Sequence, residues 1–560
     1  MTDSIIYAEK ALSQIPRLLS NQDRNPFSPT YGCFNREYWL NRTRDFPDGI
    51  AQYGTLSLAL IWAHKFPDGE KYYRNDEIKK FVIAGITYWM KIQHRDGSFD
   101  EFYQNERGWA GPTGFLLYAM VKSYELLGNE FPAKLKDNFL EAAKKSALFL
   151  ATREEPGVLS NHYAMALLPI YATYSLTKGI DCDFNHIIIK NFKKRLESFF
   201  HHCRAEGWSL EYDGADPGYL SGTISFLSKL QKYMNKEDSW YDEIQNVIDR
   251  GVGFSSYFLY PNGSYAGTIG SRQTLHFYTH GFELQGKINP LAAACAFFGR
   301  QSMDDGGLVT PEIQDERYYL YRIPELLESY IDACDSDVQI SQLPFQKDSF
   351  EKYFSDAKIF IRNTASHYAL LNLAKAGTLK IFNKVTKKLV YADDGLIAIT
   401  GNKVFTTQWI DNKYEISNVK SGWIVSGRFH HLKYDYFNAF TMTLFKMFML
   451  TTGWNAYIAG KLKGLIRNLL VTRSTPSNIY FKREFIFSDD TLTILNAINT
   501  KRKIDHLRVG GQFATRYVPQ SRYFQIEELA NKYIEINNPD LTKPIVMTIN
   551  LNNDDFSINT

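Results

Sequence analysis

The apolar residues of this chain change their spacing part-way along it, and this change limits the fold more than any other feature. Up to about residue 335, apolar residues recur at helical spacing in long segments such as IAQYGTLSLALIWAHKF and IKKFVIAGITYWMKIQ. Beyond about residue 357 the period falls to two, and Gly, Asn and Asp separate short apolar runs. The pattern predicts a helical first part and an antiparallel β second part.

The loops between the predicted helices share a character. Each begins with an acidic or amide residue and Gly, a turn signal, as in DGSFDEFYQNERGW, EGWSLEYDGADPGYLSGT, NGSYAGTIGSRQT and DDGGLVTPE. Helical hairpins that repeat with similar loops predict an (α/α) toroid, with the loops collected at one end around a cleft. We therefore predict an α+β multidomain protein, with a toroid and catalytic cleft over residues 1–340 and an antiparallel β-sandwich over residues 341–560. The stretch from Phe437 to Val471 is ambiguous between helix and strand.

The overall charge favours no particular polymeric partner. The 560 residues carry 64 basic and 61 acidic side chains, a formal charge of +3, so the net charge does not indicate nucleic acid or a lipid surface as the partner. The most hydrophobic stretch, FTMTLFKMFMLTTGW, is interrupted by Lys446 and too short to span a bilayer. The N-terminal segment lacks the layout of a secretory signal. We expect a cytoplasmic protein with no nucleic-acid partner and no membrane span, and the sequence leaves the oligomeric state open.

Two strongly hydrogen-bonding side chains, Asn161 and His162, stand together where an apolar helix begins in LSNHYAMALLPIY. The simplest interpretation is that Asn161 caps the helix and His162 is a partly buried neighbour. Tyr219 follows in the next cleft loop, 58 residues after Asn161. Its simplest role is packing at a helix entrance after Pro217 and Gly218.

A helical toroid followed by a β-sandwich, with SNHYAMAL opening an inner helix and GWSLEYDGADPGYLSGT following, resembles the heparinase II/III-like polysaccharide lyases and their alginate-lyase relatives. The resemblance implies that Asn161 and His162 bind or neutralise a uronate carboxylate and that Tyr219 exchanges protons. It also implies β-elimination on an acidic, uronic-acid-containing polysaccharide or oligosaccharide, and we expect no cofactor.

The chain departs from that family in its β domain. The family usually takes a further catalytic histidine from an early strand in a Gly-His-rich stretch, but here the equivalent stretch reads LAKAGTLKIFNK. His367, the pair His430 and His431, or the charge of Lys380 could substitute.

The chemistry of elimination explains why such side chains would be needed. Removal of the proton from C5 of a uronate is opposed by the negative carboxylate beside it, and each donor aimed at the developing enolate is typically worth about 3–4 kcal/mol. A tyrosine base must also ionise, and its ordinary pKa is about 10. Arg272, His276 and His280 in GSRQTLHFYTHGFEL could supply positive charge. We take His280 as a catalytic candidate, and Arg272 and His276 as substrate-binding ones. In the alternative, Tyr219 is the acid and a histidine is the base.

Three further residues are substrate-binding candidates. Trp109 could stack against a sugar, although core packing is the alternative, and Arg107 and Glu211 lie in neighbouring cleft loops. For Arg272, a structural ion pair is the alternative to anion binding.

Other interpretations of these loops remain open. Glu211, Asp213 and Asp216 could supply the carboxylate pair of a glycoside hydrolase, or they could simply cap and solvate a turn. His276 and His280 are four residues apart, as in many metal sites, but the stretch around them lacks helix length and an HExxH pattern, so we predict no metal.

Three rival functions remain beside the lyase: a hydrolase similar to the unsaturated glucuronyl hydrolases, a C5-epimerase, and a polysaccharide-binding or assembly protein without catalysis.

Overall fold

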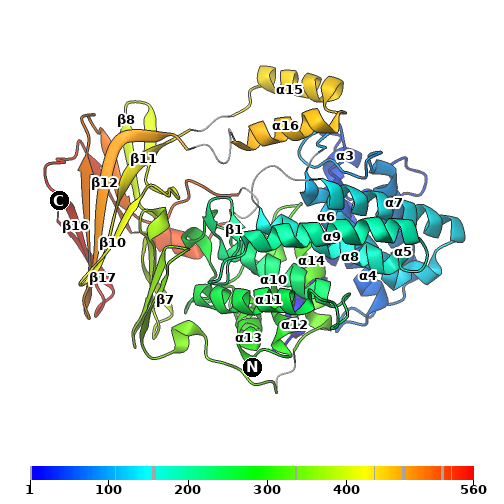
Figure 1. Ribbon diagram of the computed structural model, residues 1–560, viewed down its shortest axis with the longest axis horizontal. Coiled ribbons are helices and arrows are strands. Elements are labelled where there is room, and N and C mark those ends of the chain that lie inside the picture. Colours follow the sequence, from blue (N-terminus) through cyan, green and yellow to red (C-terminus); the bar gives the residue numbers. More distant parts are fainter. Residues whose placement is uncertain are drawn as a thin grey trace.

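The protein folds into a helical domain and a β domain that lie side by side in a computed structural model (Figure 1). The structure describes residues 3–107, 109–153, 159–334, 337–433, 436–468, 474–518, 522–530 and 532–559. The last helix of the first domain ends at Ile331 and the first strand begins at Phe350, on either side of residue 340. The predicted order of helical and β regions is therefore observed.

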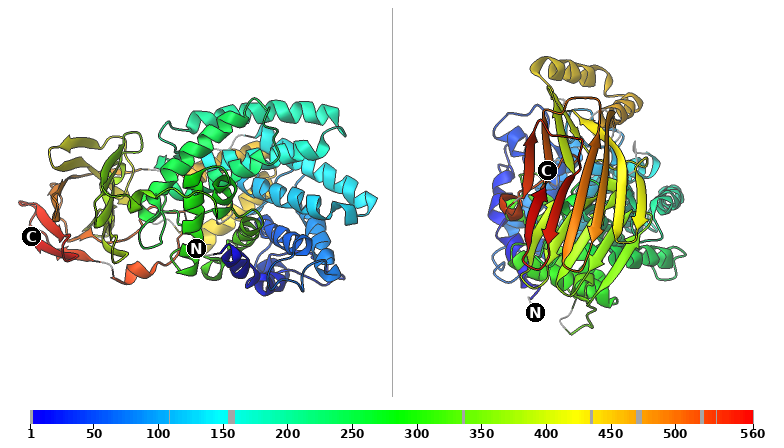
Figure 2. Two further views of the ribbon diagram at one scale, coloured as in Figure 1. Left: turned by 90° about the horizontal axis from the view of Figure 1, so that it is seen from below. Right: turned by 90° about the vertical axis from the view of Figure 1, so that its left-hand side faces the viewer.

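The helical domain is a toroid because its inner helices form a closed ring. Each inner helix packs against the next, and the last packs against the first, in the order α4 (Gly54–Ala63), α6 (Ala110–Leu127), α8 (Ser160–Thr177), α10 (Pro217–Gln231), α12 (Thr279–Gly286) and α14 (Tyr319–Ile331). Each inner helix has an outer partner, drawn from α1 (Ile5–Leu12), α5 (Asp76–Ile92), α7 (Ala133–Thr152), α9 (Cys182–His202), α11 (Tyr241–Ser255) and α13 (Pro290–Asp304). Two short helices, α2 (Ile15–Asn21) and α3 (Arg36–Trp39), complete the N-terminal part. The ring is visible at the right of the left-hand view in Figure 2.

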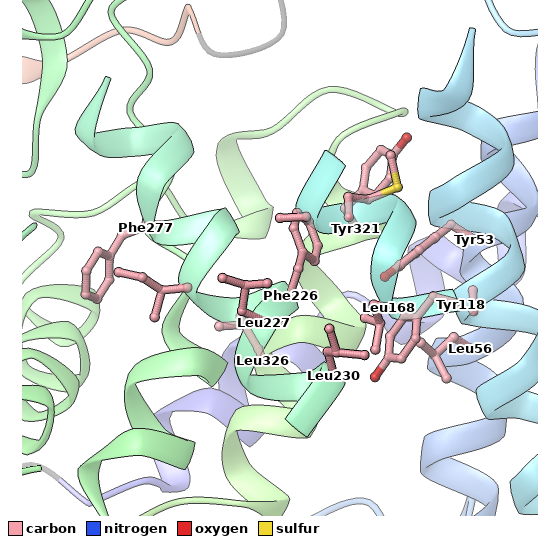
Figure 3. Close-up of a cluster of buried hydrophobic side chains, with 14 of the residues drawn as sticks. Tyr53, Leu56, Tyr118, Leu168, Phe226, Leu227, Leu230, Phe277, Tyr321 and Leu326 are labelled. Atoms are coloured by element: carbon pink, nitrogen blue, oxygen red, sulfur yellow. The ribbon is translucent and has the colours of Figure 1, made fainter. Parts of the chain in front are cut away.

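The inner helices differ from the outer ones in sequence pattern. Helices α6 and α8 are buried along most of their surface, whereas α5 and α9 bury one face and expose a charged one. The inner helices meet through apolar and aromatic side chains, including Tyr53, Tyr118, Phe226, Leu230 and Tyr321 (Figure 3). This core fixes the positions of the helix ends that carry the loops.

The β domain consists of two antiparallel sheets. One has the order β3 (Phe350–Phe354), β4 (Ile359–Asn363), β5 (His367–Asn372), β6 (Thr378–Asn383) and β7 (Lys388–Asp393). The other has the order β15 (Tyr533–Asn537), β14 (His506–Gly510), β8 (Leu396–Thr400), β9 (Lys403–Thr406), β11 (Gly422–Leu432), β12 (Pro476–Phe487), β13 (Thr491–Asn499), β16 (Ile545–Asn550) and β17 (Asp555–Asn559), with β10 (Glu415–Val419) on β11. A separate pair, β1 (Leu210–Glu211) and β2 (Gly214–Ala215), lies in a toroid loop.

The first sheet is a middle layer between the toroid and the second sheet. On β4, Ile359 and Ile361 belong to the toroid core, while Phe360 belongs to the core between the sheets. Because successive side chains of a strand point to opposite faces, both faces of this sheet are buried. The predicted fold class, a toroid followed by an antiparallel β-sandwich, is confirmed.

Polar contacts also join the two domains. From the β domain, the Lys375 ammonium donates to the carbonyl oxygens of Thr268 at 2.7 Å and Gly270 at 2.8 Å, and the Asn372 amide donates to Ile269 O at 2.7 Å. These contacts hold the toroid loop that leads into His276.

A helical hairpin interrupts the second sheet between β11 and β12. It comprises α15 (Ala439–Thr452) and α16 (Ala456–Arg467), which lie at the top of Figure 1, apart from the sheets. The ambiguous stretch at Phe437 to Val471 therefore forms two helices and no strand in its described residues. Among the described residues, no helix has the combined length and apolar character needed to cross a bilayer.

Candidate functional site

A cavity of about 890 Å³ lies at the loop end of the toroid. Among the candidates from the sequence, it is lined by Trp109, Asn161, His162, Tyr219 and His276. The other four candidates, Arg107, Glu211, Arg272 and His280, are not among its lining residues. The convergence of residues so distant in sequence follows from the toroid, which brings the ends of alternate helices to one rim.

Asn161 lies in the first turn of α8, and Glu211 holds it there. The Glu211 carboxylate accepts from the Asn161 backbone N–H at 2.6 Å and from its side-chain amide at 2.7 Å. A carboxylate at this position accepts from a backbone N–H that has no partner within the helix, and its negative charge is stabilised by the positive N-terminal end of the helix dipole. The interpretation of Asn161 as a side-chain cap is therefore wrong, because Glu211 does the capping. The prediction that Glu211 binds substrate is also not supported by its place, since it is buried behind Asn161.

Tyr219 stands in the first turn of α10 because of the three residues before it. Asp216 caps the helix and accepts from the Tyr219 N–H at 3.2 Å, and Pro217 occupies the first helical position. Gly218 lies against Thr274, where a Cβ would approach the Thr274 carbonyl oxygen to 2.5 Å. The sequence DPGY thus starts a helix and lets another loop pass close beside it.

The phenol of Tyr219 is held in its protonated form. Burial raises its pKa well above the ordinary value, and the neighbouring Tyr212 and Asp216 raise it further. The expectation that Arg272, His276 and His280 would lower this pKa is wrong. At neutral pH the group can donate a proton, which fits the acid role better than the base role.

The two cavity histidines stand against aromatic rings. The His276 ring stacks on Tyr318, with centroids 5.9 Å apart and an interplanar angle of 16°. Ser221 on α10 donates to the His276 carbonyl oxygen at 3.2 Å, which ties this loop to the helix that carries Tyr219. The His162 ring lies 6.0 Å from that of Trp109.

Trp109 packs against other side chains of the protein and is also part of the cavity wall. Its ring stacks on Phe102 at 5.0 Å, yet it also lines the cavity. The Lys463 ammonium lies 3.8 Å from the ring centroid. That face of the ring is therefore covered by a cation from the hairpin.

His280 lies outside the cavity, in a buried cluster of charges. Its Nε2 is 2.8 Å from Asp332 Oδ2, and its Nδ1 is 3.7 Å from Glu328 Oε2. The structure does not place the catalytic candidate His280 with the other site residues, because its ring lies among the buried carboxylates and not in the cavity lining.

The same cluster contains a group of potential metal ligands, His280, Glu325 and Glu328, whose ligand atoms lie within 4.8 Å of one another. However, the Lys229 ammonium binds Glu325 at 2.7 Å and Glu328 at 2.8 Å, so a cation already occupies the space between these carboxylates.

Arg272 and Asp213 form a domain junction instead of a ligand site. Arg272 is buried and donates to Asp213 Oδ1 at 2.8 Å, while Arg516 of the β domain donates to Asp213 Oδ2 at 2.7 Å. Burial alone would raise the pKa of Asp213, but the two guanidinium groups outweigh it and lower the pKa. The structural ion pair is thus the observed alternative for Arg272. Arg107 is likewise engaged outside the cavity, with Nη2 3.2 Å from His94 Nδ1.

These contacts also bear on the hydrolase interpretation. Asp213 is neutralised, and Asp216 is buried as a helix cap. Neither is among the residues that line the cavity.

Sequence reasoning missed several residues of the cavity wall. They include aromatic and cationic residues as well as acids: Arg36, Arg44, Tyr278, Arg317, Tyr318, Tyr321, Lys463 and Tyr517, and Glu37, Asp48, Asp315 and Glu316. The signal that could have found some of them is DERYYLY at Asp315, which follows the last recurring loop and combines acidic, basic and aromatic residues as the first recurring loop, DGSFDEFYQNERGW, does. Lys463 and Tyr517 come from the β domain and carry no such signal.

The β-domain substitutes for the missing histidine are not among the cavity-lining residues. His367 pairs with Asp554 at 3.0 Å. His430 is fully buried and pairs with Asp411 at 3.3 Å, and burial lowers its pKa to about 4. Lys380 is buried in the domain junction, and His431 packs on Phe405. The departure from the family pattern therefore persists in the structure.

The chain was also compared with known proteins. No protein-family model matches it, and no curated protein does. Its structural neighbours include heparinases. A structure of heparinase III aligns with a TM-score of 0.49 at 10% identity over 100% of this chain and 99% of that one. The heparan sulfate lyase HepC from Pedobacter heparinus gives 0.43 at 9% identity, over 100% of this chain and 89% of that one.

A glycosyl hydrolase of family 88 from Bacteroides vulgatus is also similar, with a TM-score of 0.37 at 12% identity. The match covers 58% of this chain and 98% of that one. Likenesses of this degree do not decide between chemistries, so the function has to be argued from the cavity itself.

Proposed function

We propose that the protein is a polysaccharide lyase that cleaves a uronic-acid-containing polysaccharide or oligosaccharide by β-elimination. The observation that carries the proposal is the meeting of Asn161, His162, Tyr219 and His276 on the wall of one cavity. A volume of about 890 Å³ is in the range of small-molecule sites and accommodates sugar units. The aromatic walls suit sugar rings.

Each step of elimination has a side chain to perform it. One cavity imidazole, that of His162 or His276, accepts the C5 proton. The Asn161 amide and the other imidazole donate to the carboxylate and stabilise the enolate. The amide nitrogen carries two N–H groups, of which Glu211 takes one and thereby orients the other.

The second step breaks the bond between C4 and the leaving oxygen, and the electron pair of the enolate forms the C4–C5 double bond. The leaving oxygen takes a proton from Tyr219, whose raised pKa keeps it protonated. The proton gained by the imidazole and the one lost by the phenol balance, and exchange with water restores both groups.

The test is a panel of uronate-containing glycans, assayed for the ultraviolet absorbance of an unsaturated uronate and by mass spectrometry. We expect an unsaturated product from the wild type, and a turnover lowered by roughly 10²–10⁴-fold in Tyr219→Phe with binding retained. Tyr171→Phe is the matched control, because its hydroxyl binds Asp238 at 2.8 Å outside the cavity.

Three results would replace the proposal. Cleavage without new absorbance indicates a hydrolase, and solvent deuterium incorporated without cleavage indicates a C5-epimerase. Binding without turnover of any glycan indicates a binding or assembly protein. Between the two histidines, His162→Gln and His276→Gln separate base from donor: loss of the base lowers kcat alone, whereas loss of a carboxylate donor also raises KM.

A further inference from the structure

The hairpin formed by α15 and α16 exposes an unusually large amount of apolar surface. On α15, Phe440, Leu444 and Met447 recur at helical spacing along one face, with Phe440 71% and Met447 58% exposed. The opposite face of α15 carries Phe445 and Met449, which line a second, mostly apolar cavity of about 530 Å³ against the toroid. The helix thus has two apolar faces, and only one is covered by the protein.

The exposed surface continues through the turn and onto α16. Trp454 is 63% and Tyr457 70% exposed, and Lys461 and Leu465 lie on the same face of α16 at four-residue intervals from Tyr457. Figure 1 and the right-hand view of Figure 2 place α15 at the outer rim of the molecule, in agreement with the exposure of its side chains. A helix that is apolar all round is ordinarily buried in a core or in lipid.

The charges of the hairpin are of one sign. From residue 436 to residue 483 the sequence contains no Asp or Glu, while Lys446, Lys461 and Lys463 lie on the two helices. Lys463 is partly buried and pairs with the buried Glu106, and Lys446 pairs with Asp45 at 3.2 Å with both side chains about half exposed. Lys461 points outward beside Tyr457, and its ammonium lies 5.5 Å from that ring.

We propose that the α15–α16 hairpin docks the protein on an anionic lipid bilayer. Aromatic and aliphatic side chains on one face, with lysines and no acidic residue in the helices themselves, are the pattern of helices that lie in the membrane interface. Trp and Tyr are also the residues that favour the level of the headgroups. The helices dock without spanning.

A second copy of the chain is the weaker choice of partner. In a two-fold dimer the same patch faces itself, so Lys461 of one hairpin would lie against a patch that has no acidic residue on its own helices. An anionic bilayer supplies the opposite charge and accepts the apolar side chains together.

The docked orientation has a consequence for the cavity. Lys463 and Ile466 of α16 line both the main cavity and the second one. The hairpin that contacts lipid is therefore also a wall of the candidate site, which would lie close to the bilayer surface. The docking itself does not depend on the proposed lyase activity.

The test is flotation of the purified full-length protein with phosphatidylcholine vesicles, with or without phosphatidylglycerol. We expect binding to the anionic vesicles, weakened by added salt and by about fivefold in Lys461→Glu. The combined variant Phe440→Ser, Leu444→Ser and Met447→Ser should lose at least about tenfold in vesicle affinity. These side chains are exposed, so the thermal unfolding midpoint should not fall.

The matched control removes three apolar residues elsewhere that are at least as exposed, in the combined variant Phe27→Ser, Ile288→Ser and Val385→Ser. It should bind vesicles like the wild type. Absence of flotation with anionic vesicles overturns the proposal, and so does equal loss in both combined variants. A concentration-dependent dimer in sedimentation that only the hairpin variant abolishes, without vesicle binding, assigns the surface to a second copy instead.

Discussion

The interior of the toroid has two polar ends, the cavity and the buried charge cluster, and the same faces of α10 and α14 contribute residues to both. On α10, one face runs from Tyr219 in the cavity through Phe226 to Lys229 in the buried charge cluster. On α14, the corresponding face runs from Tyr321 in the cavity to Glu325 in the cluster. Helical spacing places these residues on one line, but their depth along the toroid axis separates them.

The two ends treat their polar groups differently. In the cluster, Lys229, His280, Glu325, Glu328 and Asp332 neutralise one another within the core. In the cavity, polar groups such as the phenol of Tyr219 face an open volume that a ligand can fill. The comparison teaches that charge density alone does not mark a functional site, and that the accessible end is the one to which chemistry can be assigned.

The largest effect should come from breaking the cluster with Lys229→Met. This change leaves two buried carboxylates without their cation, and removing one partner of a buried pair typically costs about 3–5 kcal/mol. Unfolding in urea, followed by circular dichroism, measures the loss. The activity of the folded fraction should stay within about twofold of the wild type, because Lys229 lies outside the cavity lining.

Lys232→Met is the matched control for this change. Its partner is Asp332 at 2.6 Å, but Lys232 is largely exposed, so it should cost less than about 1 kcal/mol. If Lys229→Met and Lys232→Met lower the free energy of unfolding equally, the buried ion pairs contribute no more to stability than exposed ones do.

The second-largest effect should be a loss of stability at acidic pH that comes from the buried charge cluster and not from the cavity. Burial alone would raise the pKa of Glu325, but Lys229 and then His280 outweigh it and lower the pKa to about 2. Because the folded pKa lies below the unfolded value of about 4.3, the stabilisation is complete above pH 4.3 and is lost as the pH falls towards 2. The group contributes about 3 kcal/mol over that window.

The measurement is the free energy of unfolding against pH for the wild type and Glu325→Gln. The variant should be less stable at pH 6 and should show a shallower decline below pH 4.3. Tyr219→Phe should leave the acid limb unchanged, since this phenol is protonated in both states at these pH values. A variant curve parallel to that of the wild type would contradict the assignment of the acid limb to Glu325.

The sequence predicted the two domains because periodicity is a local property. That Asn161 and Tyr219 reach one cleft was predicted from the resemblance to a known family, and of the two only Tyr219 lies in one of the recurring loop sequences. Sequence reasoning failed for His280 because the carboxylates that surround its ring, Glu328 and Asp332, lie at the end of a helix about fifty residues further along the chain. It failed for Arg272 because the ion pair with Asp213 depends on a fold that brings two loops together.

The contributions of the β domain to the cavity were beyond the sequence for a similar reason. Lys463 and Tyr517 lie more than a hundred residues from the toroid in the chain, and only the docking of the two domains brings them to the rim. Nothing in the local pattern around either residue distinguishes it from a surface lysine or an edge tyrosine.

At the cavity end, Asn161→Ala should lower turnover about a hundredfold, the effect of one lost enolate donor and equivalent to about 2.7 kcal/mol. Single-turnover kinetics on the glycan that the panel identifies would measure it. Asn289→Ala is the control, because Asn289 lies at the start of α13 and caps it by accepting from Leu291 and Ala292. That control should cost about 1 kcal/mol of stability and no activity. Equal activity losses in the two variants would remove Asn161 from the mechanism.

The smallest effect should come from Arg36, which tests whether the cavity end selects for acidic ligands at all. Arg36 lines the cavity and is exposed, and no ion pair with it is found among the described residues. An exposed cation contributes less than about 1 kcal/mol to binding an anion, so Arg36→Ala should raise KM by up to about fivefold with kcat unchanged. Arg36→Glu should raise KM further, and added salt should reduce both effects because screening weakens the interactions of exposed charges.

The control for net charge is Lys236→Ala, which removes an exposed lysine outside the cavity lining. If Arg36→Glu and Lys236→Ala leave KM equally unchanged at low salt, the rim does not read the charge of the ligand, and selection for a uronate would rest on the donors deeper in the cavity.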